Sequence, residues 1–246
     1  MDIEMKKRME RILANCKKVE DDYECPKCRD RGYIFKDNGV GGEVAIPCEC
    51  KDKKEALEKL QKSNLKDAFK SRTFKTYATE KPFQLQAKTK AMKFCKEFKN
   101  TNASLILCGQ PGAGKTHLGT AAMLNLISQN VGCKYEEYTN MIMSLKQAVN
   151  DEENYIREED KYTSPRVLFL DDFLKGKTTD ADLKYIYKVI NTRYLQQKPI
   201  IISTELTIQQ IISWDEAVGS RLVEMSQGNI ITFGNNAENY RLKNII

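Results

Sequence analysis

Eight consecutive residues, Gly109-Gln-Pro-Gly-Ala-Gly-Lys-Thr116, constrain the fold of this chain more than any other segment. They fit the pattern G-x-x-x-x-G-K-[ST], and they lie between the apolar run Ser104-Leu-Ile-Leu-Cys108 and a segment with helical spacing. In a loop between a strand and a helix, glycines let backbone N–H groups converge on phosphate oxygens, and the helix N-terminus adds its dipole. The alternative is a Gly/Pro turn without function, which the agreement of strand, motif and helix disfavours.

Every residue of this loop is therefore a candidate for binding a nucleoside triphosphate. The predicted set is Gly109, Gln110, Pro111, Gly112, Ala113, Gly114, Lys115 and Thr116. The lysine is expected to contact the β- and γ-phosphates, and the threonine hydroxyl to bind Mg²⁺. His117, the only histidine, follows on the first helical turn and joins this set by position, although packing or capping suits it better than catalysis.

Strand-like and helix-like segments alternate from residue 103 onward. Candidate strands cover residues 104–108, 132–138, 166–170 and 199–203, with helical spacing between them. Strands separated by helices of ten or more residues indicate a parallel sheet that is covered on both faces. We therefore predict an α/β fold of the P-loop NTPase kind, a parallel sheet flanked by helices.

Two carboxylates end one of these strands, in Val167-Leu-Phe-Leu-Asp171-Asp172. At the carboxyl edge of a buried strand, Asp171 is expected to hold Mg²⁺ through water, and Asp172 to orient or deprotonate the attacking water. This interpretation expects the strand to lie beside the P-loop strand. A strand that ends in aspartate is also common without function, so the preceding P-loop is what favours catalysis.

The strand Pro199-Ile-Ile-Ile-Ser203 ends in polar groups at the same expected edge. Ser203 or Thr204 is a candidate for a hydrogen bond to the γ-phosphate or the lytic water, and a polar turn is an equal alternative. Neither Asn-Lys-x-Asp nor an Asp-x-x-Gly after the aspartate pair is found, so ATP is preferred over GTP.

Four of the eight cysteines form the pairs Cys25-x-x-Cys28 and Cys48-x-Cys50. Two short strands joined by the glycine-rich segment 38–42 would carry the first pair back toward the second. Four thiolates from two tight turns suit a closed tetrahedral zinc site, which a small fold with few large apolar side chains needs for stability. A redox motif and an iron–sulfur cluster are the alternatives. The other four are predicted to be core thiols: Cys16, Cys95, Cys108 and Cys133.

Positive charge is concentrated in one part of the 246-residue chain. Residues 66–99 carry ten basic and three acidic side chains, whereas the whole chain has a net charge of +6. Such a band fits contact with a nucleic-acid backbone, although lysine is also common on a solvated helix face. No apolar run approaches the roughly 18 residues of a membrane helix, and the start lacks the apolar core of a secretory signal. A cytoplasmic protein without a membrane partner is expected.

An irregular stretch near residues 71–82 predicts the domain boundary. Residues 1–70 would hold an amphipathic helix of about 18 residues and the cysteine module, and residues 71–246 the ATP-binding domain.

Several motifs together give the chain a family resemblance. Besides the cysteine pairs and the P-loop, they are Thr73-Phe-Lys-Thr-Tyr77, Leu168-Phe-Leu-Asp-Asp-Phe173 and Val218-Gly-Ser-Arg-Leu222. With these motifs the chain resembles the DnaC/DnaI-type replicative helicase loaders, which are AAA+ ATPases, and it is also similar to the IstB transposition ATPases. The resemblance covers roughly residues 70–246, and the cysteine module resembles the amino-terminal zinc domain of DnaI-like loaders.

This resemblance implies a set of partners and roles. Loaders of this kind bind the hexameric helicase through the amino-terminal domain, contact single-stranded DNA and hydrolyse ATP. Arg221 matches the arginine finger that reaches a neighbouring subunit's γ-phosphate, and Arg241, in Asn-Tyr-Arg-Leu, matches a late arginine that touches the nucleotide in cis. Without the resemblance, a surface ion pair would be the preferred reading of either arginine. Members of the family often carry asparagine where this sequence has Glu205, so the sequence departs from the family pattern beside the candidate sensors Ser203 and Thr204.

Two other classes of function remain open at this point. A transposition helper ATPase would coat duplex DNA and recruit a transposase, and the cysteine module favours the loader over it. A small-molecule kinase would use the same P-loop together with a mobile arginine-rich lid, and no such sequence occurs between residues 172 and 221.

Overall fold

A computed structural model describes residues 25–37, 39, 42–48, 50–51, 65, 67–176 and 178–234. The chain divides into two compact units, Met1–Lys54 and Glu55–Ile246. The predicted N-terminal helix lies outside the described residues, as do Cys16 and Arg241.

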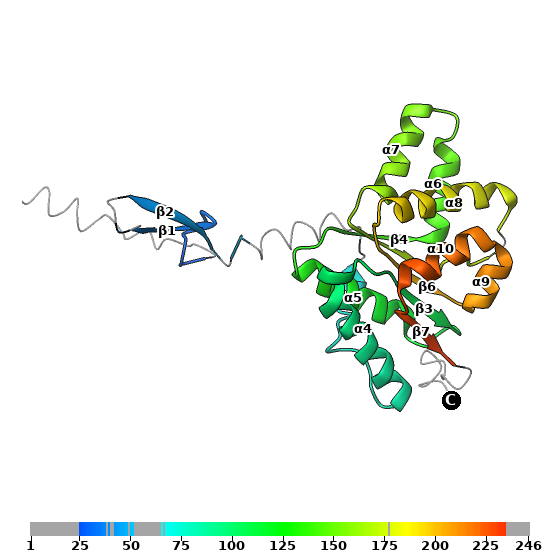
Figure 1. Ribbon diagram of the computed structural model, residues 1–246, viewed down its shortest axis with the longest axis horizontal. Coiled ribbons are helices and arrows are strands. Elements are labelled where there is room, and N and C mark those ends of the chain that lie inside the picture. The colour runs from blue at the N-terminus through cyan, green and yellow to red at the C-terminus, as the bar shows by residue number, and fades with distance from the viewer. Residues whose placement is uncertain are drawn as a thin grey trace, which may run out of the picture. The chain divides into compact units, whose positions relative to one another are not determined.

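The second unit is built on a five-stranded parallel sheet in the order β4-β5-β6-β3-β7 (Figure 1). Its strands are β3 (Leu105–Gly109), β4 (Cys133–Glu137), β5 (Val167–Asp171), β6 (Ile200–Thr204) and β7 (Ile230–Phe233). The first four lie where the sequence predicts them, so the predicted α/β P-loop fold with a parallel sheet is confirmed. β7 was not predicted.

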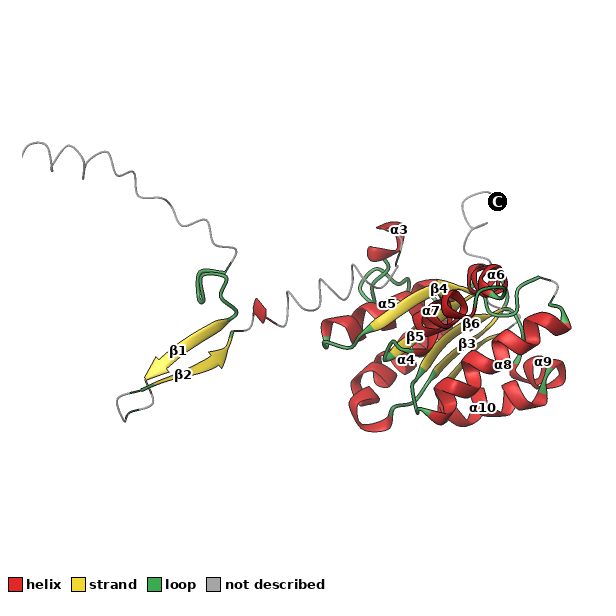
Figure 2. Ribbon diagram, turned by 90° about the horizontal axis from the view of Figure 1, so that it is seen from above, coloured by secondary structure: helices red, strands yellow, loops and turns green. Residues whose placement is uncertain are grey.

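Helices cover both faces of this sheet (Figure 2). They are α3 (Asp67–Lys70), α4 (Pro82–Thr101), α5 (Lys115–Ser128), α6 (Tyr138–Ala148), α7 (Glu152–Thr163), α8 (Asp180–Leu195), α9 (Ile208–Trp214) and α10 (Glu216–Ser226). Successive side chains of a strand point to opposite faces. Leu105 and Leu107 of β3 accordingly pack in one apolar cluster with α4 and α5, and Ile106 and Cys108 in a second one with α6, α8 and α10.

One prediction about the sheet is wrong: the P-loop strand β3 does not lie beside β5, the strand of Asp171. β6 lies between them, and its Ile201 is in register with Leu105 of β3 on one side and Phe169 of β5 on the other. All five residues of β6 are buried, which suits a central strand. The carboxyl end of β6 is therefore placed between the P-loop and Asp171.

The first unit contains a two-stranded antiparallel sheet of β1 (Tyr33–Asp37) and β2 (Glu43–Pro47). The cysteine pairs precede β1 and follow β2, so the predicted return of the chain is confirmed. Large apolar side chains on both strands are exposed: Tyr33, Phe35, Val44 and Ile46. Within the part of this unit that the structure describes, only Cys28 and Cys48 are buried. The hairpin thus lacks an apolar core in its described part.

Three of the predicted core thiols are confirmed, because Cys95, Cys108 and Cys133 are all buried in the second unit. Across the described ranges, no helix combines the length and the apolar character that crossing a membrane requires.

Candidate nucleotide site

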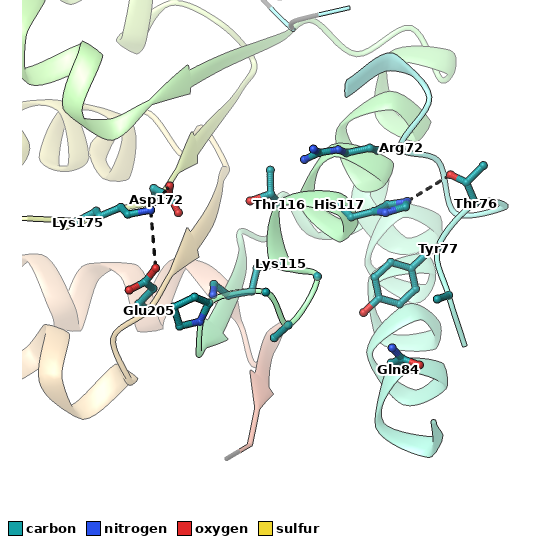
Figure 3. A pocket seen from close by; sticks show the side chains of 15 residues that line it. Arg72, Thr76, Tyr77, Gln84, Lys115, Thr116, His117, Asp172, Lys175 and Glu205 are labelled. Carbon is teal, nitrogen blue, oxygen red and sulfur yellow. Dashed lines mark hydrogen bonds and ion pairs between the residues drawn. The ribbon is translucent and has the colours of Figure 1, made fainter. Parts of the chain in front are cut away.

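A cavity of about 300 Å³ opens at the carboxyl edge of the sheet, around the P-loop (Figure 3). Its lining includes the P-loop from Pro111 to Thr116, the turn after β5, and the segment that leads into α4. Asp172, Lys175 and Glu205 lie on one side of Lys115, and Tyr77 and Gln84 on the other (Figure 3). A volume of this size suits a small ligand.

The glycines of the P-loop are required by its backbone. Gly109 has φ 141°, and a Cβ there would lie 2.5 Å from the carbonyl oxygen of Phe233 in β7. Gly114 has φ 95°, and a Cβ there would lie 3.1 Å from the ring of Tyr77. Positive φ and close neighbours both exclude larger residues, so the loop keeps the tight conformation in which backbone N–H groups surround an anion.

Lys115 lies almost fully buried under the loop, with 5% of its surface exposed. Its Nζ donates to the carbonyl oxygens of Gly109 at 2.6 Å and Gln110 at 2.8 Å. Burial lowers the pKa of Lys115, and nearby carboxylates, led by Glu205, oppose that shift. The two carbonyl groups thus hold the ammonium group inside the loop, where phosphate oxygens would replace them.

Asp171 is the centre of a buried hydrogen-bond network at the end of β5. Its Oδ1 accepts from the hydroxyl of Thr116 at 3.0 Å and from the hydroxyl of Ser203, and its Oδ2 accepts from Tyr135 at 3.1 Å. Burial raises the pKa of Asp171, and the three hydrogen bonds oppose this effect. Carboxylate and hydroxyl oxygens are the ligands that Mg²⁺ prefers, so Thr116 and Asp171 fit the predicted magnesium site.

Asp172 adopts the left-handed conformation, with φ 54°, and its side chain lies at the cavity. Its carboxylate accepts from Lys175 Nζ at 2.8 Å, and the same Nζ lies 3.8 Å from the carboxylate of Glu205 (Figure 3). The sequence does not predict Lys175 as a site residue, and it marks Glu205 only as a difference from the family resemblance. The turn after β5 and the end of β6 bring them together.

The segment before α4 supplies a second wall that sequence reasoning also missed. Tyr77 is buried, its hydroxyl has no hydrogen-bond partner among the described residues, and burial raises its pKa to about 12. The ring of His117 contacts the edge of the Tyr77 ring, and its Nε2 lies 3.1 Å from the carbonyl oxygen of Thr73. Burial lowers the pKa of His117. His117 therefore fixes this segment against the P-loop helix α5.

The remaining predicted residues lie away from the cavity lining. Thr204 is fully buried, and its hydroxyl donates to the carbonyl oxygen of Phe173 at 2.8 Å, which argues against a direct contact with the γ-phosphate. Arg221 on α10 donates to the carbonyl oxygen of Ala217 at 2.8 Å and to Asn191 Oδ1 at 3.1 Å. It does not complete the site of its own chain.

The two cysteine pairs, Cys25 and Cys28 with Cys48 and Cys50, come together as predicted. Their sulfur atoms all lie within 4.8 Å of one another, with Cys25 Sγ 3.8 Å from Cys48 Sγ and Cys28 Sγ 3.2 Å from Cys50 Sγ. A tetrahedron of zinc–sulfur bonds of about 2.3 Å has sulfur–sulfur edges of roughly 3.8 Å. The backbone N–H of Gly32 also donates to Cys28 Sγ at 3.3 Å. The thiols therefore fit a tetrahedral zinc ion.

The sheet order, the P-loop and the carboxylate network together define an AAA+ P-loop ATPase. Within this class, the chain belongs to the family described as IstB-like ATP binding protein, which residues 48–245 match. The phage-like element PBSX protein XkdC of Bacillus subtilis (strain 168) is 35% identical, over 97% of this chain and 95% of the relative. The replicative helicase loader DnaC of Escherichia coli (strain K12) is 21% identical, over 74% of each chain.

Solved structures show the same fold. A crystal structure of the DnaC helicase loader superposes with a TM-score of 0.61 at 24% identity, and covers 69% of this chain and all of that one (100%).

Proposed function

We propose that this ATPase loads a replicative DNA helicase onto single-stranded DNA in the cytoplasm. The observation that carries the proposal is the combination, in one chain, of an AAA+ ATPase unit and a cysteine-held hairpin with exposed apolar side chains. Tyr33 and Phe35 lie on one face of the hairpin and Val44 and Ile46 on the other, so each face exposes a pair of apolar side chains. Exposed apolar surface supports the docking of a protein there. The likeness to DnaC, whose name is that of a helicase loader, supports a helicase as the partner that residues 1–70 bind.

In this proposal the P-loop holds Mg-ATP, with Lys115 at the β- and γ-phosphates and Thr116 and Asp171 at the magnesium ion. Asp172 orients the attacking water from the end of β5. Arg221 acts in a neighbouring subunit, which agrees with its position on α10 outside the cavity of its own chain. Arg241 touches the nucleotide in cis.

Zinc is the proposed structural metal of the hairpin. The support is the geometry of the four sulfur atoms together with the absence of an apolar core in the described part of the hairpin. A closed site of four thiolates stabilises a fold directly, because the metal binds only the folded arrangement. The bound ion would thus keep the docking hairpin in shape.

The outer face of α4 is the proposed contact for the DNA backbone. Lys90, Lys96 and Lys99 are exposed there, and among the described residues they form no ion pair. Lysines that contact a phosphate backbone release the counterions bound to the nucleic acid, which favours binding. Binding of this kind weakens as the salt concentration rises. Replacing all three by glutamine is expected to weaken binding of a single-stranded oligonucleotide, while Lys184→Gln on α8 has no such effect.

The second candidate is a transposition helper ATPase that binds duplex DNA. The match to the IstB-like family favours this candidate, since the matched residues 48–245 include most of the ATPase unit. The two candidates differ in the partner that the first unit binds: a hexameric helicase or a transposase.

The deciding experiment is capture of a purified hexameric replicative helicase by the full chain in the presence of Mg-ATP. Phe35→Asp, in the exposed hairpin, is expected to abolish capture with unchanged ATP hydrolysis. Met143→Asp on α6, where Met143 is 58% exposed, is the matched control and should retain capture. Capture that is equal for both variants would contradict docking through the hairpin, and capture of a transposase but no helicase would favour the second candidate.

A further inference from the structure

Three charged side chains meet on the side of the cavity that faces away from α4. Lys175 Nζ lies 2.8 Å from the carboxylate of Asp172 and 3.8 Å from that of Glu205, and all three residues line the cavity (Figure 3). They come from two neighbouring strand ends, because Asp172 and Lys175 follow β5 and Glu205 follows β6.

The two carboxylates pose an electrostatic problem for the ligand. Asp172 and Glu205 place negative charge on the side of the cavity where the terminal phosphate of ATP would lie. The carboxylates and the phosphate carry like charges and repel each other. Glu205 therefore requires a nearby cation for ATP to bind well, and Lys175 is placed to supply it.

The turn that carries Lys175 is anchored by the residues that precede it. Phe173 and Leu174 are buried in the core, and the backbone N–H of Lys175 donates to the carbonyl oxygen of Asp172 at 3.1 Å. The side chain itself is half exposed, with 50% of its surface accessible. A fixed base and a long, solvated side chain let the ammonium group reach a ligand while it keeps its carboxylate partners.

We propose that Lys175 is a second phosphate-binding cation, which Asp172 and Glu205 position opposite Lys115 for the γ-phosphate of ATP. Lys115 approaches the phosphates from inside the P-loop, and Lys175 approaches from the turn after β5. The site then distinguishes ATP from ADP, since only ATP carries the phosphate that Lys175 contacts. This inference rests on ATP binding at the P-loop and is independent of the machinery that the ATPase serves.

The test compares ATP and ADP affinities of the full chain, measured by calorimetry with Mg²⁺. Lys175→Met is expected to weaken ATP binding about 10-fold and to leave ADP binding within about 2-fold, because one charged hydrogen bond is lost for ATP alone. Lys184→Met, an exposed lysine on α8 outside the cavity, is the matched control and should change neither. Lys115→Ala should weaken both nucleotides, which separates loss of the cradle from loss of Lys175.

A second comparison decides whether Lys175 touches the phosphate or only neutralises Glu205. In a Glu205→Gln background the repulsive carboxylate is gone, yet Lys175→Met should still weaken ATP binding about 10-fold. If the Glu205→Gln change cancels the loss, or if ATP and ADP weaken equally in Lys175→Met, the proposed contact is refuted. Helicase capture by the Lys175→Met variant tests the proposed loading function separately.

Discussion

Gly119 sets the distance between the P-loop helix α5 and the strand that carries Asp171. It lies on α5 one turn after Lys115, and a Cβ at this position would lie 2.5 Å from Cζ of Phe169 in β5. The Phe169 ring is fully buried, and it packs edge-on with the ring of Tyr135, with 5.3 Å between the ring centroids. It therefore has no space to move away from the new methyl group. In Gly119→Ala, the helix is therefore expected to move away from the sheet.

The size of that movement follows from the contact. An ordinary carbon–carbon contact needs at least about 3.4 Å, so α5 has to shift by roughly 1 Å relative to β5. Overpacking of this kind lowers the unfolding free energy by about 1–3 kcal/mol. Alanine offsets about 1 kcal/mol of this loss, because its helix propensity is higher than that of glycine. The net loss of stability is small. The catalytic loss is larger, since the 3.0 Å contact between Thr116 and Asp171 opens with the helix, and a displacement of 1 Å costs about 100-fold in rate.

The assay is steady-state hydrolysis of Mg-ATP together with the unfolding free energy of each variant. Gly119→Ala should keep most of its stability and lose about 100-fold in kcat. Gly132→Ala, where a Cβ meets nothing within 4 Å, should behave like the parent. Adding Phe169→Leu to Gly119→Ala makes room for the methyl group and should restore much of the rate. Parent-like hydrolysis by the single variant would refute the link between this contact and the magnesium site.

Two further predictions concern stability. Arg193 is fully buried and donates to five backbone carbonyls. Arg193→Met should therefore lower the unfolding free energy, measured by chemical denaturation, by about 3–5 kcal/mol. Arg157→Met removes an exposed ion pair and should change the unfolding free energy by less than about 1 kcal/mol. Chelation of zinc in the full chain should make the hairpin sensitive to protease while the ATPase unit stays folded, and Cys48→Ser should reproduce this pattern. A protease pattern that chelator leaves unchanged would contradict a structural metal.

The sequence predicts those strands and helices whose buried positions are occupied by a clear pattern of apolar residues. β3, β5 and β6 are apolar runs, and each lies within one residue of its predicted range. α7 was not predicted because it is mostly charged, with Tyr162 and Thr163 as its buried residues. β7 and α9 were also missed, since they have only four and seven residues, and α10 with its 11 residues was missed as well. Periodicity needs a longer, one-sided segment to be visible.

The site shows a similar division between local and long-range information. The P-loop is contiguous in sequence, so it is predicted residue by residue. The hydrogen-bond partners of Asp171 come from three elements, and the sequence predicts only Thr116 and Ser203 as site residues. The third partner, Tyr135, lies on β4, and nothing in the sequence of that strand marks it as part of the site. Strand order decides these contacts, and a sequence without its pairing partners does not specify that order. The expectation that β3 and β5 are neighbours failed for this reason.

The inserted strand β6 also orients the side chains that we propose as magnesium ligands. Ser203 reaches Asp171 from β6, and the backbone N–H of Asp172 donates to the Ser203 hydroxyl at 3.0 Å, so the carboxylate cannot rotate freely. The Thr116 hydroxyl donates a hydrogen bond to Asp171, which leaves the lone pairs of the hydroxyl oxygen available for a cation. A strand order with β3 beside β5 would remove Ser203 from this position. The strand that separates β3 from β5, against the prediction, is therefore the one that orients the proposed metal ligands.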